Sequence, residues 1–293
     1  MLGKAKRFLH KHRDRLALAR PYEDHEGEHP AWMNLFKAPP FVTSEFNIAL
    51  GPVQGEGTAL RVGVLADPHV GSHPGDIERL NAAVEVLNAL APDLVVLPGD
   101  FMNMTPIGWG RVPPERIAEV LSGLTQQRRY AVLGNHDRDF GAPRVQRALE
   151  SANIDVLENR ALDVAIGNRR LRLIGIEDAS TGAPDLSLMK TDHSVDLNMI
   201  LTHDPALFTH APAGDVVMIC GHTHGGQIVL PFLGPVINCS EAPLHWTYGH
   251  VNEDGKHLVV SAGFGTSGLP IRWNRPPEIA LLTIELGASA GGG

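Results

Sequence analysis

The chain contains five short clusters of aspartate, histidine and asparagine, and each cluster follows directly after an apolar run. The five runs are RVGVLA, DLVVLP, RYAVLG, NMILT and DVVMIC. The polar residues that follow them are, in chain order, Asp67, His69, Asp100, Asn135, His136, His203, His222 and His224. Carboxylate, amide and imidazole groups, with no thiolate among them, are ligands that suit manganese, iron or zinc. The clusters therefore indicate a metal site.

The elements that must position these clusters are buried strands. Short runs rich in Val, Ile and Leu predict strands of an α/β fold, and residues 77–90, between the first two runs, have helical spacing as in a βαβ unit. Residues 162–177 alternate around a Gly-Asn turn and predict a hairpin, while residues 257–264 and 278–286 predict later strands. In an open α/β sheet, ligands bind outside the carboxyl ends of the strands. All five clusters stand at such ends.

The spacing within the clusters predicts how many metal ions they hold. Asp67 and His69 are two positions apart, which puts both side chains on one face of an extended segment, and His222 and His224 repeat this spacing. Asp100 offers a carboxylate that can bridge two ions. With the single donors added, the set of expected ligands is Asp67, His69, Asp100, Asn135, His203, His222 and His224. This set is large enough for two cations with open positions for water.

The same residues belong to a series of motifs with specific spacing. The motifs are Asp67-Pro68-His69, Gly99-Asp100, Gly134-Asn135-His136-Asp137, the single His203 and Gly221-His222-Thr223-His224. In this order, and each after a predicted strand, they resemble the calcineurin-like metallophosphoesterase family over roughly residues 60–285. The resemblance implies an α/β fold, a four-layer αββα sandwich of two mixed β-sheets flanked by helices. Residues 225–227 and 263–279 are similar to the bacterial membrane-associated phosphodiesterase-like branch, which includes pyrophosphatases acting on nucleotide-linked lipid sugars.

The resemblance also implies a role for each matched residue. One metal ion would be held by Asp67, His69 and His224, and the other by Asn135, His203 and His222, with Asp100 bridging the two. The expected catalytic residues are Asp100 and His136, since His136 would face the substrate phosphate as a general acid or as a stabiliser of charge. The implied cofactors are two divalent metal ions, manganese foremost, with iron or zinc as alternatives.

The reaction that the resemblance implies is the hydrolysis of a phosphodiester or a pyrophosphate by a hydroxide that two metal ions activate. The substrate would be a phosphate ester, either lipid-linked or a nucleotide. Three alternatives stay open: a phosphomonoesterase, a nuclease, and a metal-free binding or scaffold module on the same fold. A degenerate scaffold is expected to have lost some of the metal ligands, whereas every one of them is present here.

Four further residues are predicted to contact the substrate. Many relatives have an acid three residues after the Gly-Asp aspartate, where this chain has Asn103, which can orient an imidazole but cannot stabilise its charged form. The acid role of His136 therefore has less support than the metal site. His73 lies close to the Asp-x-His turn, and Arg272 and Arg275 lie in a glycine-rich loop that could grip a phosphate. For the two arginines, a Gly-Pro turn with solvated side chains is the alternative.

Composition and charge exclude several classes of function. The chain has 293 residues, 43% of them hydrophobic, and a formal net charge of −8, so it lacks the electrostatic attraction that drives nucleic-acid binding. A nuclease is also disfavoured by the aromatic content of 5%. Cys220 and Cys239 are too few for a disulfide framework, and we predict that both are buried thiols in a reducing, cytoplasmic compartment. No apolar run reaches the length of a membrane span, and no secretion signal is recognisable.

The first 59 residues are predicted to lie outside the catalytic domain. Residues 1–20 hold seven Lys and Arg against one acid, so they form either a solvated arm or a peripheral contact with an anionic membrane. Residues 21–59 are rich in proline and predict a connector. The metallophosphoesterase domain is expected over residues 60–286, and residues 287–293 as a disordered tail. Residues 231–250 form either an apolar rim for a lipid or nucleoside, or ordinary packing. The sequence does not determine the oligomeric state.

Overall fold

The computed structural model describes residues 37–51, 59–105, 110–236 and 238–286. The predictions for the basic arm at residues 1–20 and for the tail at residues 287–293 lie outside these ranges. Within them the chain forms two sheets of six strands each and a short two-stranded hairpin. Among the described residues, no helix has both the length and the apolar character needed to span a membrane.

The first sheet combines the three motif-bearing strands of the first half of the chain with strands from its two ends. In spatial order its strands are β1 (Val42–Leu50), β14 (Glu278–Leu286), β2 (Ala59–Val64), β3 (Leu94–Leu97), β4 (Arg129–Ala131) and β5 (Asp155–Val156). The pairs are parallel except for β14 with β2. The carboxyl ends of β2, β3 and β4 therefore meet at one edge of the sheet.

The second sheet brings the remaining two motif-bearing strands together at its centre. Its order is β12 (Gly249–Glu253), β13 (Lys256–Val260), β9 (Val216–Cys220), β8 (Leu197–Leu201), β7 (Arg169–Gly175) and β6 (Arg160–Ile166). The four inner strands are parallel, and the two outer pairs are antiparallel. The predicted hairpin is thus confirmed as β6 and β7. The small hairpin consists of β10 (Val229–Leu230) and β11 (Gly234–Pro235).

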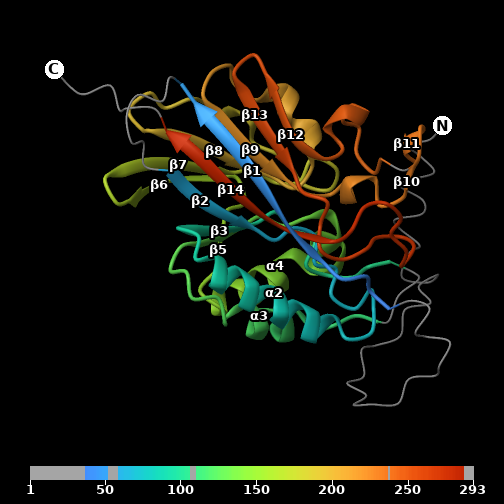
Figure 1. Cartoon of the computed structure of the whole chain (residues 1–293). Coiled ribbons are helices and arrows are strands. Elements are labelled where there is room, and N and C mark those ends of the chain that lie inside the picture. Colours follow the sequence, from blue (N-terminus) through green and yellow to red (C-terminus); the bar gives the residue numbers. More distant parts are fainter. Residues whose placement is uncertain (1–36, 52–58, 106–109, 237, 287–293) are drawn as a thin grey trace.

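Helices cover the outer faces of the two sheets (Figure 1). On the first sheet they are α2 (Asp76–Leu90), α3 (Pro114–Leu121) and α4 (Asn135–Ser151). On the second sheet the covering elements are the short 3-10 helices η3 (Pro205–His210) and η5 (Leu244–Trp246), which pack on the core. The described residues form two more 3-10 helices, η2 (Leu186–Leu188) and η4 (His224–Gly226). The expected sandwich of two mixed sheets flanked by helices is confirmed, with 3-10 turns in place of α-helices on the second outer face.

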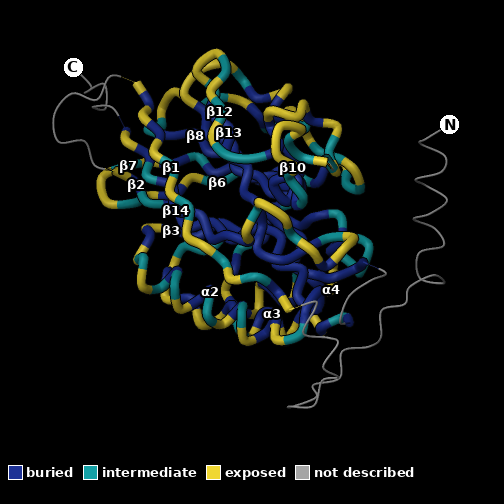
Figure 2. The backbone as a smooth tube through the Cα atoms, turned by 45° about the vertical axis from the view of Figure 1, so that its right-hand side comes forward, coloured by how far each residue is buried: buried dark blue, intermediate teal, exposed yellow. Residues whose placement is uncertain are grey.

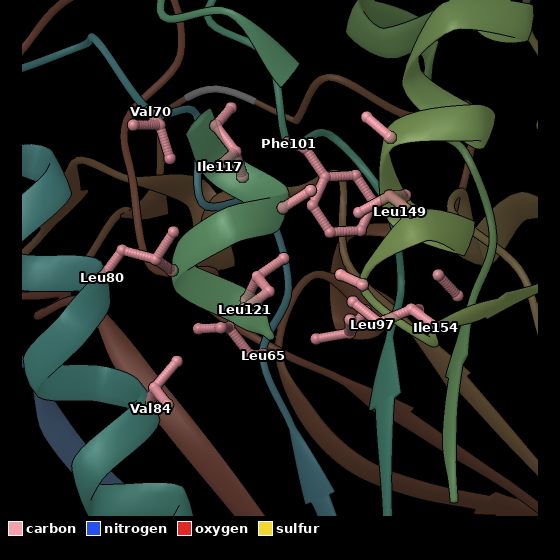
Figure 3. Packing of buried hydrophobic residues seen from close by; sticks show 14 of the residues in the cluster. Leu65, Val70, Leu80, Val84, Leu97, Phe101, Ile117, Leu121, Leu149 and Ile154 are labelled. Carbon is pink, nitrogen blue, oxygen red and sulfur yellow. The ribbon is translucent and has the colours of Figure 1, made fainter. Parts of the chain in front are cut away.

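Burial on both faces explains why the motif-bearing strands are continuously apolar. In β3, Leu94 and Val96 pack between the two sheets, while Val95 and Leu97 pack beneath the helices. Because side chains alternate along a strand, a strand that is covered on both sides needs an apolar residue at every position. Figure 3 shows the helix-side cluster, in which Leu97 and Phe101 meet Leu149 of α4. Figure 2 shows the same layering, with dark blue strands inside and exposed residues on the outer faces of the helices.

Two predictions are wrong in detail. Residues 42–50, assigned to a connector, form β1, which pairs along its whole length with β14. Their burial pattern explains the error, since only Ile48 and Leu50 are buried and the partner strand lies far away in the sequence. Cys220 is buried at the end of β9, as predicted, but Cys239 is exposed because it lies in a loop after β11.

Candidate metal centre

The seven predicted ligands lie in the loops that follow five strands. Asp67 and His69 follow β2, Asp100 follows β3, and Asn135 begins α4 just after β4. His203 follows β8, and the His222–His224 pair follows β9. All are buried except Asn135, which is half-buried. The two sheets therefore place the carboxyl ends of five strands side by side, as the pattern of strand-end clusters predicts.

The spacing argument assumed an extended backbone at these loops, but the backbone there is not extended. Asp67 and His69 have φ of 49° and 40°, and Asp100 has a φ of 57°. His222 and His224 have φ of 70° and 52°. The left-handed region is unfavourable for residues with a side chain, and such strain is typical of functional sites. The paired side chains converge because each loop turns sharply, and not because they alternate along a strand.

Asp67, His69 and His224 form the first ligand group. The Nε2 atoms of His69 and His224 lie 3.1 Å apart, and the Nε2 of His224 lies 4.0 Å from Oδ1 of Asp67. Burial lowers the pKa of His69 to about 4, and burial together with the nearby His69 lowers the pKa of His224 well below its usual value. In the metal-free protein one of these two nitrogens donates its hydrogen to the other, and both converge on the point where a cation would bind.

Asp100, His203 and His222 form the second group. The Nδ1 of His222 lies 3.1 Å from the Nε2 of His203, which in turn lies 3.2 Å from Oδ2 of Asp100. The same Asp100 oxygen lies 3.4 Å from the Nε2 of His69, in the first group. The carboxylate of Asp100 therefore stands between the two groups, in the position from which it could bridge two cations.

The amide of Asn135 supports the fit of a metal to the centre. Its Oδ1 is buried and has no hydrogen-bond partner among the described residues. A buried carbonyl oxygen without a partner is costly, and a cation would satisfy it. Close approach of the loops is possible because glycines line them: a Cβ at Gly134 would lie 2.2 Å from Oδ1 of Asp100, and one at Gly221 would lie 2.3 Å from Oδ2 of Asp67. The donor set and the cradle both fit a pair of divalent ions.

Backbone carbonyls fix which nitrogen two of the histidines present to the centre. The Nδ1 of His69 lies 3.1 Å from the carbonyl oxygen of Met102, and the Nδ1 of His203 lies 2.6 Å from that of Pro98. If each Nδ1 donates its hydrogen to the carbonyl, the Nε2 is left as the ligand atom. His222 is reversed, because its Nε2 lies 3.2 Å from the carbonyl oxygen of Cys239 and its Nδ1 faces His203.

The charges at the centre are unevenly distributed. Burial raises the pKa of Asp67 to about 6. Burial also acts to raise the pKa of Asp100, but the charges of His203 and His136 outweigh it and hold that pKa well below its usual value. For His203, burial acts to lower the pKa, and the charge and hydrogen bond of Asp100 outweigh it, so the pKa lies well above its usual value. Without a cation, Asp100 and His203 thus form an ion pair.

His136 lies beside the two groups. Its Nε2 is 4.0 Å from Oδ2 of Asp100 and 3.5 Å from the hydroxyl of Ser267, and its ring meets that of His69 edge-on at 4.6 Å. Its backbone N–H donates to Oδ1 of Asp100 at 2.8 Å. Asp137 accepts hydrogen bonds from the backbone N–H groups of residues 100, 102 and 134, so it ties the Gly-Asp loop to the start of α4. Asp137 thus caps the start of α4.

The four predicted substrate contacts lie near the centre but are engaged with the protein itself. Asn103 donates to the carbonyls of Gly71 and Gly110 and accepts from Thr105, so all of its polar atoms hold loops together. His73 is buried, with its Nε2 3.0 Å from the Thr266 hydroxyl.

The two arginines are also engaged. Arg272 donates to a ring of backbone carbonyls that includes those of Ala262 and Gly263, and burial lowers its pKa. Arg275 donates to the carbonyl of Gly225, and its guanidinium lies 3.8 Å from the centre of the Tyr248 ring. Of the two, only Arg275 stacks on an aromatic side chain beside the Gly-His-x-His loop.

Two acids that sequence reasoning did not select also lie beside the second group. Asp204 is buried, with Oδ2 3.9 Å from the Nε2 of His222, on the side of that ring away from His203. Asp178 is buried and has an Oδ1 without a hydrogen-bond partner among the described residues; although burial acts to raise its pKa, the charges of His203 and His222 lower it. Asp178 follows β7 by three residues, so the same strand-end rule would have found it.

The model of a protein family described as calcineurin-like phosphoesterase matches residues 60–232, which is more than half of the chain. The chain belongs to the calcineurin-like phosphoesterase family. The matched range holds all seven expected ligands together with His136. The family assignment that the motifs implied is confirmed, and with it a metal-dependent hydrolase of phosphate esters.

Curated relatives resemble the chain over most of its length. The phosphodiesterase YaeI of Escherichia coli (strain K12) is 30% identical over 204 residues, which cover 66% of this chain and 70% of YaeI. An uncharacterised metallophosphoesterase of Bacillus subtilis (strain 168), YkuE, is 28% identical over 215 residues, which cover 71% of this chain and 73% of YkuE. Among solved structures, the NAD nucleotidase of Haemophilus influenzae aligns with a TM-score of 0.48 at 16% identity, over 70% of this chain and 45% of the nucleotidase.

Proposed function

We propose that the chain is a dinuclear metal-dependent phosphodiesterase or pyrophosphatase. The observation that supports this most directly is the place of Asp100, whose Oδ2 lies 3.4 Å from one ligand group and 3.2 Å from the other. In this proposal Asp67, His69 and His224 would hold one cation, and Asn135, His203 and His222 would hold the other. Asp100 would be shared by both. Manganese is the expected metal, with iron or zinc as alternatives, since all three accept oxygen and imidazole ligands.

Two bound divalent cations would supply a hydroxide nucleophile near neutral pH and neutralise charge on the phosphate. The protein's part is to hold the ligands and to manage the leaving group. His136 stands at the edge of both groups, hydrogen-bonded through its backbone to Asp100. Its imidazole could give a proton to the leaving oxygen, or stabilise the charge that develops there. Asn103 cannot assist it, because its polar atoms are used within the loops.

The proposal also specifies which class of phosphate ester the chain hydrolyses. The name of YaeI, a phosphodiesterase, favours a substrate with two ester or anhydride links at phosphorus. A diester carries one negative charge, so it requires fewer cationic side chains around the metals than a monoester does. This agrees with a site in which Arg272 is engaged with backbone carbonyls. A lipid-linked or nucleotide diester or pyrophosphate in the cytoplasm is the expected substrate, and contact of residues 1–20 with a membrane surface is part of the same proposal.

The test combines metal content with hydrolysis of two model esters. Purified protein is reconstituted with Mn²⁺, its metal content is measured by elemental analysis, and it is assayed on bis(p-nitrophenyl) phosphate and on p-nitrophenyl phosphate. We expect about two ions per chain and a clear preference for the diester. The Asp67→Asn variant should lose metal and activity, whereas Asp93→Asn, at an exposed position in the same half of the protein, should lose neither. A protein that takes up no metal and hydrolyses neither ester would instead be a binding or scaffold module.

A further inference from the structure

Exposed apolar side chains gather beside the metal centre. Ten large hydrophobic residues are exposed among the described residues, and most of them lie in two short segments. We call this set the apolar rim: Leu230, Phe232, Leu233, Val236, Leu269, Ile271 and Trp273. Exposed apolar side chains that occur singly need no explanation, but a cluster of this kind marks an interaction surface.

Hydrogen bonds hold the two segments of the apolar rim side by side. The backbone N–H of Val229 donates to the carbonyl of Trp273, and that of Trp273 donates to Gln227. The side chain of Gln227 donates to the carbonyls of Ser267 and Leu269 and accepts from the N–H of Ser267. The β10–β11 hairpin and the loop before β14 thus form one surface, and Figure 1 shows both at one end of the sandwich.

This surface borders the catalytic groups. Gln227, which joins the two segments, is three residues after the ligand His224. Ser267, in the second segment, places its hydroxyl 3.5 Å from the Nε2 of His136. A molecule or surface that covers the apolar rim would therefore lie next to the metal centre.

Phe232 is placed in a way that folding does not explain. Its side chain is fully exposed, with a relative exposure of 107%, so none of the described residues covers it. Its backbone has a φ of 67°, in the left-handed region where glycine or asparagine is usual. Both properties make phenylalanine an unfavourable residue for the folded protein. A role in binding accounts for it, because an aromatic ring at the tip of a hairpin can enter an apolar environment.

The lack of charged residues around the apolar rim indicates which kind of partner it binds. Residues 228–240 and 263–271 contain no charged residue at all, although much of this stretch is exposed. Uncharged loops with exposed Phe, Leu and Ile are typical of surfaces that enter the headgroup boundary of a bilayer, and Trp273, next to Arg272, lies at the edge of these loops.

A surface that binds an anionic membrane also needs basic residues, and the sequence outside the described residues contains them. Phe41 packs its ring on Phe264, 5.1 Å between ring centres. Earlier in the sequence, residues 1–20 contain seven Lys and Arg and one acid. Apolar insertion together with basic residues is the combination that binds anionic lipid stably.

We propose that the apolar rim enters the headgroup region of a lipid bilayer and so presents the metal centre to phosphate groups at the membrane surface. The second half of this statement rests on the proposed hydrolase function, and the first half does not. Binding to lipid and hydrolysis of a soluble ester are separate measurements, so either can fail alone.

The test is cosedimentation of the full chain with vesicles of phosphatidylethanolamine and phosphatidylglycerol. We expect the variant Phe232→Gly with Leu233→Ser to partition onto the vesicles at least about tenfold more weakly, because two strongly exposed apolar side chains are removed. Glycine suits the φ of residue 232, so this variant should melt no lower than the original protein. Leu186→Ser, at another exposed leucine, is the matched control and should bind as before.

Fluorescence gives a second readout. Brominated phospholipids quench tryptophan that enters the bilayer. The chain has four tryptophans, and of the two that the structure describes, Trp273 is exposed in the apolar rim and Trp246 is buried. We expect quenching in the original protein and a clear decrease of it in Trp273→Phe.

Three results would overturn the proposal. The first is that the original protein does not sediment with the vesicles. The second is that the double variant sediments as well as the original. The third is that the original protein is a dimer in solution and the double variant a monomer, which would make the apolar rim an interface between copies of the chain. Hydrolysis of bis(p-nitrophenyl) phosphate is measured in parallel; vesicle binding without hydrolysis would remove the proposed activity and leave the membrane surface in place.

Discussion

The two ligand groups of the metal centre use the same residue types in different electrostatic settings. In the first group, the imidazoles of His69 and His224 face each other, and burial keeps both neutral. In the second, His203 lies against Asp100, and the carboxylate holds a proton on the imidazole. A histidine must be neutral to bind a metal. The first group is therefore ready to accept a cation near neutral pH, whereas the second must first release a proton. The two cations should bind with different dependence on pH, although the motifs give no hint of it.

Asp100 is the residue that both groups share, and its substitution should have the largest effect. In Asp100→Asn the amide keeps the shape but loses the charge, so both cations lose a ligand and His203 loses its ion-pair partner. We expect at least about a hundredfold loss of diesterase activity and fewer than two ions per chain by elemental analysis. Asp93→Asn, at the exposed start of the same strand, is the control and should behave as the original protein. An Asp100→Asn protein with two ions and near-full activity would show that the carboxylate does not bridge.

The pH dependence of metal binding tests the difference between the groups. The pKa of His203 is higher in the folded protein than in the unfolded chain, where it is about 6.5. Its proton therefore stabilises the metal-free fold in full when the pH is below about 6.5. This stabilisation is lost as the pH rises through the pKa of the folded state. Because the cation displaces that proton, affinity at the second group should rise about tenfold per pH unit in this window. His69 and His224, with lowered pKa values, are already neutral there and should release no proton.

Calorimetric titration of the metal-free protein in two buffers with different ionisation enthalpies measures the protons released at each step. We expect one step that releases about one proton and one that releases almost none. A titration in which both cations release the same number of protons would remove the difference between the groups. His245→Asn, at an exposed histidine outside the centre, should leave both steps unchanged.

The sequence predicts where the candidate donors lie along the strands because the rule that places them is local. An apolar run that ends in a polar cluster marks both a buried strand and its carboxyl end, so Asp67 and His203 can be found without a structure. Long-range pairing is not visible in this way. β1 was missed although its side chains alternate between inward and outward, because among the described residues its pairing strand is β14, far away in the sequence.

The contacts that surround a side chain could not be predicted from the sequence either. Arg272 and Asn103 are residue types that could bind phosphate, but the way the loops fold directs them to backbone carbonyls, that of Ala262 for Arg272 and that of Gly71 for Asn103. The charge on His203 depends on a 3.2 Å contact with Asp100 across two sheets. A motif states which residue types are present; the fold decides which of them stay free to act and which carry a proton.

Asp204 should have the smallest effect, confined to the second group. Its carboxylate lies 3.9 Å from the Nε2 of His222, longer than a hydrogen bond, and it also contacts the Ser240 hydroxyl and caps η3. Asp204→Asn keeps an oxygen for the cap but removes the charge behind His222. A carboxylate behind a histidine ligand typically contributes 10- to 100-fold to metal affinity, and at this longer distance we expect about threefold to tenfold. The loss should appear in the affinity of one cation and disappear at saturating Mn²⁺, with kcat then restored. A kcat that stays low at saturating metal would mean that Asp204 acts on the reaction itself and not through His222.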